Sequence, residues 1–323
     1  MTAAVPVDRF EHEALFYRGD EDFLAGLLPF IREGLDRDED VVVAEPRPRL
    51  EQLQNALGTD ARAVEFLDMA EVGANPGRII GVWARRLDTA SGAGRRLRGV
   101  GEPAFPGRRT VEFAECTLHE MLLNLAFDDG PGWRLLCPYD RAHLPRAVTQ
   151  GALRTHPVIA TADSRLPSSA YAPAGHVGAF AEPLREPGDA VLRGRYGPGD
   201  VPAIRRTVAQ WARSCGVPDE RVRVLELAAS ELAADSIRRS GTGTLALWLE
   251  DGAALVQFSD AGTLGDPLTG RLPASADDGG ALHLLNQLCD LVQVRSSDRG
   301  TTVRITTLLP ARWAGPPGAP PSR

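Results

Sequence analysis

An acidic pair in the C-terminal third of the sequence could bind a cation or accept a proton. Glu231 and Asp235 stand four residues apart within a helical pattern, so both carboxylates lie on one helix face. Like charges at this spacing repel by roughly a few tenths of a kcal/mol unless a cation or a hydrogen-bond donor lies between them. Arg239 follows Asp235 by four residues and offers such a donor. A solvated helix face is the alternative interpretation of this pair.

Two glycine-containing segments follow the acidic pair. Asp260 and Gly262 come directly after an apolar run typical of a strand. Gly279 and Gly280 open a helical segment, whose free backbone N–H groups could receive phosphate oxygens. Each segment alone is also typical of a turn or a helix boundary. The order of the segments along the chain is more informative than any one of them.

In the N-terminal half, three residues on one predicted helix could meet a metal ion. Cys116, His119 and Glu120 follow i, i+3, i+4 spacing, but no fourth ligand is evident, so structural packing is the favoured interpretation. Asp140 ends a predicted strand, where ligands bind in parallel sheets, and a turn or helix cap explains it equally well. The other polar candidates of this half are His12, Tyr17 and Glu102.

The composition excludes several kinds of site. All 36 basic residues are arginine, which excludes a lysine-dependent phosphate loop, a Schiff base and a lysine general base. The 43 acidic residues give a net charge of −7, which argues against a dedicated nucleic-acid binder. No apolar stretch approaches the roughly 20 residues that span a bilayer, and the acidic N-terminus is unlike a signal peptide. We therefore expect a cytoplasmic protein that contacts neither membrane nor nucleic acid.

The cysteines support the same compartment. They are too few and too scattered for a disulfide framework or a CxxC zinc site, which indicates free thiols in a reducing cytoplasm. The four are Cys116, Cys137, Cys215 and Cys289.

Alternating strands and helices predict an α/β domain over residues 1–162. Buried strands are expected at residues 14–17, 41–44, 64–67, 96–101 and 133–137. Amphipathic helices are expected at residues 23–35, 49–57, 79–87 and 117–127. Because strands and helices alternate, the crossovers imply a mainly parallel sheet.

The remaining chain predicts a linker, a second domain and a tail. Residues 163–200 are rich in Pro, Gly and Ser and predict a linker with one strand near 190–193. Residues 201–309 predict an α+β domain, because helices and antiparallel-looking hairpins segregate along it, with a helical layer over a mixed sheet. Its helices are expected at 201–215, 219–239 and 280–289, and its strands at 244–250, 253–259, 291–296 and 301–308. The Pro-rich tail, residues 310–323, is expected to be disordered.

The motif order over residues 200–309 resembles the GHKL ATP-binding domain shared by histidine kinases, Hsp90 and gyrase. The sequence is most similar to the RsbW and RsbA types of anti-sigma factor regulators. The segments with this similarity are ELAASELAADS at 226–236, DPLTGR at 266–271 and LNQLCDLV at 285–292. The resemblance implies a Bergerat-type two-layer sandwich that binds ATP and Mg²⁺.

The resemblance also implies roles for the candidate residues. Asp260 would accept a hydrogen bond from the adenine amino group, and Gly262 would let the adenine ring approach. Glu231 would be the general base during phosphorylation of a partner serine. Asp235 occupies the position of a Mg²⁺-binding asparagine. The other nucleotide-binding positions implied are Gly279 and Gly280 in the phosphate lid, with Thr301 or Thr302 near the adenine.

Several positions depart from the family pattern. The metal position holds Asp235, the usual histidine of the helical motif is Arg239, and the second lid glycine is Ala281. The intervening arginine of the lid is Gly280. Asp remains an oxygen ligand, but a Cβ at Ala281 opposes close approach of phosphate to the backbone. ATP and Mg²⁺ binding is therefore expected to be weak or absent.

The N-terminal half resembles the MEDS domain, a DcmR-like sensory module with a RecA- or KaiC-like fold. The similarity lies in HEALFY at 12–17, GVGEP at 99–103, the helix at 116–124, LCPYD at 136–140 and HP at 156–157. It implies that this domain receives a signal from a small molecule or a partner. The loop at 18–22 would occupy the phosphate-loop position, but it is acidic and lacks lysine, so nucleotide hydrolysis is not expected there.

Three functions remain open from the sequence. The first is an anti-sigma-factor-like regulator whose degenerate GHKL domain binds a sigma factor or a STAS-type antagonist, with a homodimer left open. The second is an active Mg-ATP-dependent serine kinase, in which Asp235 holds the metal and Glu231 is the base. The third is a small-molecule enzyme in the N-terminal half that uses Cys116, His119 or Asp140.

Overall fold

The computed structural model describes residues 9–161, 164–188, 192–273 and 280–310. The chain divides into two compact units, Met1–Val177 and Gly178–Arg323. None of the helices in these described ranges is long and apolar enough to cross a membrane. The predicted disordered tail after residue 310 lies outside the described residues.

The N-terminal unit contains a seven-stranded sheet in the order β3-β2-β4-β5-β1-β6-β7. Every neighbouring pair is parallel except β6 and β7, which are antiparallel, so the predicted parallel α/β architecture is confirmed. The strands are β1 (Glu11–Tyr17), β2 (Asp40–Glu45), β3 (Val64–Asp68), β4 (Leu97–Gly101), β5 (Arg134–Asp140), β6 (Val158–Ala160) and β7 (Arg165–Pro167).

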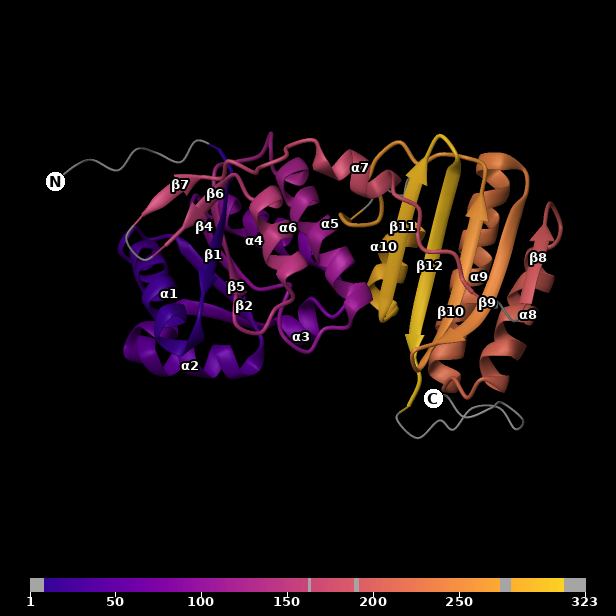
Figure 1. Cartoon of the computed structure of the whole chain (residues 1–323), viewed down its shortest axis with the longest axis horizontal. Helices are drawn as coiled ribbons and strands as arrows, with labels where there is room; N and C mark the ends of the chain where they lie inside the picture. Colours follow the sequence, from indigo (N-terminus) through magenta and orange to yellow (C-terminus); the bar gives the residue numbers. More distant parts are fainter. Residues whose placement is uncertain (1–8, 162–163, 189–191, 274–279, 311–323) are drawn as a thin grey trace. The chain divides into compact units, whose positions relative to one another are not determined.

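Helices cover this sheet (Figure 1). They are α1 (Gly19–Asp36), α2 (Arg47–Leu57), α3 (Met69–Val72), α4 (Ile79–Gly92), α5 (Thr110–Ala126) and α6 (Arg146–Thr155). A further short helix, α7 (Gly175–Ala181), includes the boundary between the two units. Short 3₁₀ turns lie at Gly58–Ala63 and Pro76–Arg78. The short elements α3, α6, α7, β6 and β7 were not predicted; β6 and β7 are only three residues long, and β7 is exposed throughout.

The two faces of the central strands have different characters. Successive side chains of a strand point to opposite faces. Leu15 and Tyr17 of β1 therefore join the apolar core with Phe23 and Leu27 of α1. His12 points to the other face, where its Nδ1 lies 3.1 Å from Oδ1 of Asn124 in α5. One face is thus an apolar core, and the other contains buried polar groups beneath α5.

The second unit contains a five-stranded sheet in the order β11-β12-β10-β9-β8. Its strands are β8 (Leu192–Tyr196), β9 (Gly243–Glu250), β10 (Ala253–Asp260), β11 (Leu291–Ser297) and β12 (Gly300–Leu308). Its helices are α8 (Val201–Ser214), α9 (Asp219–Ser240) and α10 (Gly280–Leu288). The strand β8, within the predicted linker stretch, pairs with β9 at the sheet edge.

All four strand pairs of the second sheet are antiparallel, so the prediction of a mixed sheet is wrong. The reason lies in its tight hairpins. Asp251 and Gly252 join β9 to β10 with φ of 48° and 70°, the positive values that two-residue hairpin turns require. Gly300, with φ of 122°, opens β12 directly after the turn from β11. Such turns bring consecutive strands back antiparallel.

Candidate functional site

In the C-terminal unit, Asp260 at the end of β10 meets the last turn of α9. Arg239 Nη2 donates to Asp260 Oδ2 at 2.7 Å, and Arg239 Nε donates to Oδ1 at 3.4 Å. The backbone N–H of Gly262 donates to the same Oδ1 at 2.9 Å. The Asp260 side chain is 1% exposed. Both of its oxygens are therefore engaged by groups of the protein itself.

Close backbone packing surrounds this ion pair. A Cβ at Gly262 would lie 2.6 Å from Cβ of Arg239, so any larger residue would push the arginine away. A Cβ at Gly300 would lie 2.1 Å from the carbonyl oxygen of Asp260. The two glycines thus allow the turn after β10 to pack on both α9 and β12.

Of the two candidate threonines, one belongs to this site. Thr301 pairs with Asp260 across β10 and β12, and its Oγ1 donates to Gly262 O at 2.8 Å. Thr302 pairs with Ser259 and lies on the opposite face of the sheet, with its Oγ1 3.1 Å from Ser259 Oγ. The structure therefore brings Asp260, Gly262 and Thr301 together and places Thr302 elsewhere.

On α9, Asp235 pairs with a different arginine from the one that its i, i+4 spacing suggests. Asp235 forms an ion pair with Arg238, three residues later. The expectation that Arg239 serves Asp235 is wrong, because Arg239 pairs with Asp260 instead. Glu231 lies exposed one turn earlier on the same helix.

The predicted phosphate lid is described only in part. Gly279 lies outside the described residues. Gly280 is the first residue of α10 and is exposed, and a Cβ there would meet no atom within 4 Å. The role of these glycines in phosphate binding stays a prediction.

In the N-terminal unit, five polar side chains gather at the carboxyl edge of the sheet: Tyr17, Glu45, Arg49, Glu102 and Asp140. The Tyr17 hydroxyl donates to Glu102 Oε1 at 3.1 Å. The Arg49 guanidinium stacks over the Tyr17 ring, 5.2 Å from its centroid. Ligands of parallel α/β sheets bind at this edge. Glu45 and Arg49 were not singled out from the sequence, although Glu45 directly ends a buried strand.

Asp140 anchors a turn at this edge. Its Oδ1 accepts the backbone N–H of Ala142 at 2.8 Å, and its Oδ2 lies 2.8 Å from His143 Nδ1. Burial opposes ionisation, but the hydrogen bonds from His143 and the backbone outweigh it and lower the pKa of Asp140. This geometry matches the turn-cap interpretation of Asp140.

On the other face of the sheet, His12, Glu120, Cys137 and His156 form a buried cluster. Burial and the neighbouring His156 lower the pKa of His12 to about 4, although Glu120 opposes this shift. Of the candidate trio on α5, for which packing was the favoured interpretation, only Glu120 belongs to this cluster, and the Cys116 thiol donates to Pro103 O at 3.2 Å. Glu120 faces strands β1 and β5 instead. Cys137 and His156 were missed as site residues because no local spacing connects them to His12.

Two family models match the chain. The model of the MEDS domain, the methanogen/methylotroph DcmR sensory domain, matches residues 11–157. The histidine kinase-like ATPase domain matches residues 196–307. The chain joins a MEDS sensory domain to a histidine kinase-like ATPase domain. This pair of domains supports a signalling regulator.

No curated protein matches the chain. Among solved structures, the crystal structure of the RsbU and RsbW domains of Rv1364c from Mycobacterium tuberculosis matches with 16% identity and a TM-score of 0.29. The match covers 38% of this chain and 35% of that chain.

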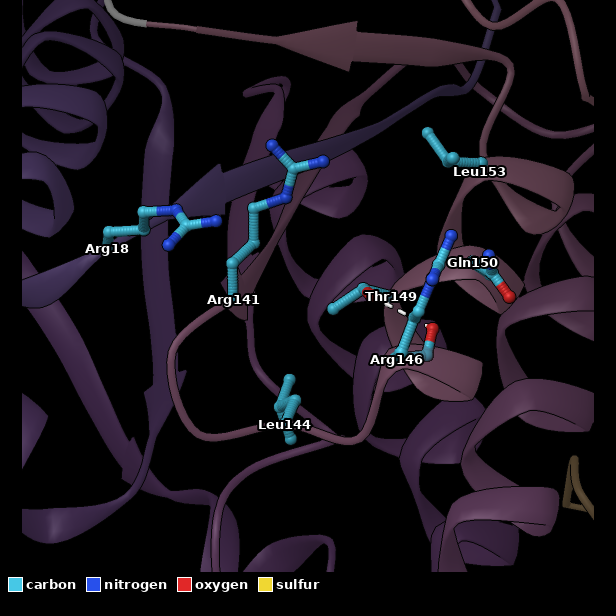
Figure 2. A pocket seen from close by; sticks show the side chains of 7 residues that line it. All are labelled: Arg18, Arg141, Leu144, Arg146, Thr149, Gln150 and Leu153. Carbon is cyan, nitrogen blue, oxygen red and sulfur yellow. Dashed lines mark hydrogen bonds between the residues drawn. The ribbon is translucent and has the colours of Figure 1, made fainter.

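The MEDS domain has a pocket of about 490 Å³ at the carboxyl ends of β1 and β5 (Figure 2). Arg18 directly follows β1, Arg141 directly follows β5, and Arg146 begins α6. Among the described residues, none of these three guanidinium groups forms an ion pair. The pocket is also lined by Leu144, Thr149, Gln150 and Leu153. Three unpaired cations at this edge favour an anionic ligand.

The Glu45 carboxyl of the MEDS domain makes the stability of the fold depend on pH. Burial, and then the charge of Glu102, raise the pKa of Glu45 well above its usual range. The folded chain thus holds this proton more tightly than the unfolded chain. The contribution of this proton to stability is complete below the ordinary glutamate pKa and is lost as pH rises through the raised value.

We therefore expect Glu45→Gln to stabilise the MEDS domain by about 1 to 2 kcal/mol above neutral pH and to change little near pH 5. Urea unfolding measured across this pH range checks the result. Glu51→Gln on the exposed face of α2 is the matched control and should follow the unsubstituted protein. A parallel pH profile for Glu45→Gln and the unsubstituted protein would contradict the assignment.

Proposed function

We propose that this protein is an anti-sigma-factor-like regulator, in which the MEDS domain receives a signal and the ATPase-like domain binds a protein partner. The partner class is a sigma factor or a STAS-type antagonist, and the site of action is the cytoplasm. The observation that supports this proposal best is the buried pair of Arg239 with Asp260. In this pair, Arg239 occupies the Asp260 carboxylate that, by the family resemblance, would recognise adenine.

The residues present fit Mg-ATP poorly. The Asp260 oxygens accept from Arg239 and from the Gly262 N–H, so an adenine amino group finds neither oxygen free. Asp235, at the metal position, is paired with Arg238. Bringing ATP into this site would require both arginines to move. The ATPase-like domain then acts through its surface, as a binding module.

The fold supports a finer assignment of both domains. The strand order of the N-terminal sheet, with β1 between β5 and β6 and antiparallel β7 at the edge, supports a RecA/KaiC-like domain that extends through β7, past the predicted boundary at residue 162. Helices α8, α9 and α10 with the antiparallel sheet support a Bergerat-type sandwich that includes β8, before the predicted boundary at residue 201. The stretch 163–200, predicted as a linker, thus contributes one strand to each sheet.

Signal input is assigned to the arginine-lined pocket of the MEDS domain. Arg18, Arg141 and Arg146 present positive charge, and Leu144 and Leu153 add apolar surface. This lining suits a small organic anion with a short hydrocarbon part. Direct nucleic-acid or membrane binding is not part of the proposal, since the chain has a net charge of −7.

Calorimetry with Mg-ATP, followed by a pull-down from the native organism, tests the proposed output. We expect no measurable heat with Mg-ATP and capture of a sigma factor or STAS-type protein without added nucleotide. Micromolar ATP binding together with transfer of phosphate to a partner serine would overturn the proposal in favour of the serine kinase. Turnover of a small molecule that survives deletion of residues 200–323 would favour an enzyme in the N-terminal half.

The arginine-lined pocket makes a separate prediction. Inorganic phosphate, used as a probe anion, should stabilise the protein by about 1.4 kcal/mol at a concentration ten times its Kd. Arg141→Gln combined with Arg146→Gln should remove this gain, because the pocket loses two of its three cations. Arg154→Gln, on the exposed end of α6 outside the pocket, is the control. Equal thermal shifts in all three proteins would exclude the pocket.

A further inference from the structure

Four potential metal ligands converge inside the N-terminal unit, away from the carboxyl edge. His12 Nε2 lies 3.0 Å from Glu120 Oε2 and 3.4 Å from Cys137 Sγ. Glu120 Oε2 lies 3.7 Å from Cys137 Sγ and 3.5 Å from His156 Nε2. All four ligand atoms lie within 4.8 Å of one another, and all four residues are buried. They come from β1, α5, β5 and the residue that follows α6.

The outer hydrogen bonds determine which nitrogen of His12 faces the cluster. Asn124 Nδ2 donates to the carbonyl oxygens of Glu120 and Thr155, at 3.2 and 2.8 Å, which fixes the orientation of its amide. Its Oδ1 is therefore the atom that lies 3.1 Å from His12 Nδ1, and it must accept that N–H. The Nε2 of neutral His12 then presents a lone pair to the cluster.

The same reasoning applies to His156. Its Nδ1 lies 3.0 Å from the carbonyl oxygen of Ala152, which can only accept, so Nδ1 carries the proton. Thr155 Oγ1 donates to the same carbonyl and accepts from Nδ1 at 2.8 Å. The buried Nε2 of His156 makes no hydrogen bond among the described residues. Its lone pair also points to Glu120 Oε2.

Glu120 completes the arrangement. Its Oε1 accepts the Tyr139 hydroxyl at 2.9 Å, so its Oε2 is the oxygen that faces both imidazoles. Two imidazole lone pairs and a carboxylate oxygen at these distances repel unless a proton or a metal cation lies between them. Hydrogen-bond partners behind the ligands, here Tyr139, Asn124 and Ala152, are also what orients ligands in metal sites.

We propose that His12, Glu120, Cys137 and His156 bind one zinc ion inside the MEDS domain. Zinc takes four N, O and S ligands in a tetrahedron, and bonds of about 2.0 to 2.3 Å imply ligand-to-ligand separations of about 3.3 to 3.8 Å. Four of the six separations between the ligand atoms, 3.0 to 3.7 Å, lie close to this range, and all six are within 4.8 Å. The Cys137 proton leaves to solvent on binding, and the sulfur binds as a thiolate.

The site is closed, which indicates a structural role for the ion. The cavity beside Glu120 and Tyr139 measures about 10 Å³, so a substrate has no room there. Four protein ligands without an open position are typical of structural zinc. The ion would tie α5 and the end of α6 to the central strands. This inference goes beyond the proposed function, since it depends neither on the partner nor on nucleotide.

The test uses the full-length chain without a histidine tag, stripped with chelator and titrated with Zn²⁺ and with Co²⁺. We expect one equivalent of either metal, a rise in thermal stability with Zn²⁺, and a thiolate-to-cobalt charge-transfer band with tetrahedral d–d bands. Cys137→Ser should abolish the charge-transfer band. Cys116→Ser should keep it, because the Cys116 thiol is also buried but donates to Pro103 O outside the cluster.

A positioning variant provides a second readout. Asn124→Leu removes the acceptor of His12 Nδ1–H and should weaken Zn²⁺ binding by about 10- to 100-fold, with the cobalt charge-transfer band retained at saturation. Circular dichroism checks that each variant is folded. The proposal fails if folded, unsubstituted protein binds neither metal stoichiometrically. It also fails if Cys137→Ser and Cys116→Ser give the same cobalt spectrum.

Discussion

Replacing Arg98 with methionine is expected to lower the free energy of unfolding of the N-terminal unit by about 3 to 5 kcal/mol. The Arg98 side chain, on β4, is fully buried. Its Nε donates to Glu39, and its Nη1 donates to Glu33 Oε2 at 2.8 Å. Methionine keeps much of the packing volume but leaves the buried Glu39 carboxylate without this donor. An unpaired buried charge costs far more than a lost surface ion pair.

Arg32 on the same unit offers a matched control. It forms an ion pair with Asp60 at 3.5 Å, and both side chains are nearly half exposed. Arg32→Met should therefore cost less than about 1 kcal/mol. Calorimetric unfolding of the full chain should show the Arg98→Met loss in the N-terminal transition only. Adding Glu39→Gln should restore part of the stability, and losses of equal size for Arg98→Met and Arg32→Met would contradict this account.

Much of the fold could be predicted because the apolar runs of this chain are local signals. The run at Val41–Ala44 matches the buried strand β2, the run at Val64–Leu67 matches the partly buried edge strand β3, and α9 ends within one residue of its predicted end. The prediction was less successful where an element depends on a distant partner. A strand was predicted near 190–193, but β8 lies at Leu192–Tyr196, because it has no apolar pattern of its own and is set by its pairing with β9.

The candidate sites show the same limit more strongly. Asp260, Gly262 and Thr301 could be found together because a motif connects them. The partner of Asp260 could not, since Arg239 lies 21 residues earlier and its helical spacing pointed to Asp235. Likewise, 125 residues separate His12 from Cys137, and only the parallel register of β1 and β5 brings them together. Ion pairs and ligand clusters are set by tertiary packing, which local spacing does not encode.

Replacing Arg239 with histidine is expected to increase the affinity for Mg-ATP by about 10- to 100-fold. The change removes the charge-assisted hydrogen bonds that Arg239 makes to Asp260, each worth about 1.5 to 3 kcal/mol, while every 1.4 kcal/mol corresponds to tenfold in affinity. Asp260 Oδ2 then becomes available to an adenine amino group, and Oδ1 keeps its hydrogen bond from Gly262. Histidine is also the residue that the GHKL resemblance places at this position. Isothermal titration with a non-hydrolysable ATP analogue measures the gain.

Two further variants decide whether Asp260 is the reason for any gain. Arg238→His alters the neighbouring arginine, which pairs with Asp235, and should leave the affinity unchanged if adenine recognition is the limiting contact. Asp260→Asn in the Arg239→His background should remove the gain, since the recognising carboxylate is lost. If Arg238→His restores ATP binding instead, the obstruction lies at the metal position and not at the adenine-binding position. If both arginine variants bind no ATP, the pocket has lost nucleotide recognition altogether, and the ATPase-like domain acts only as a protein-binding surface.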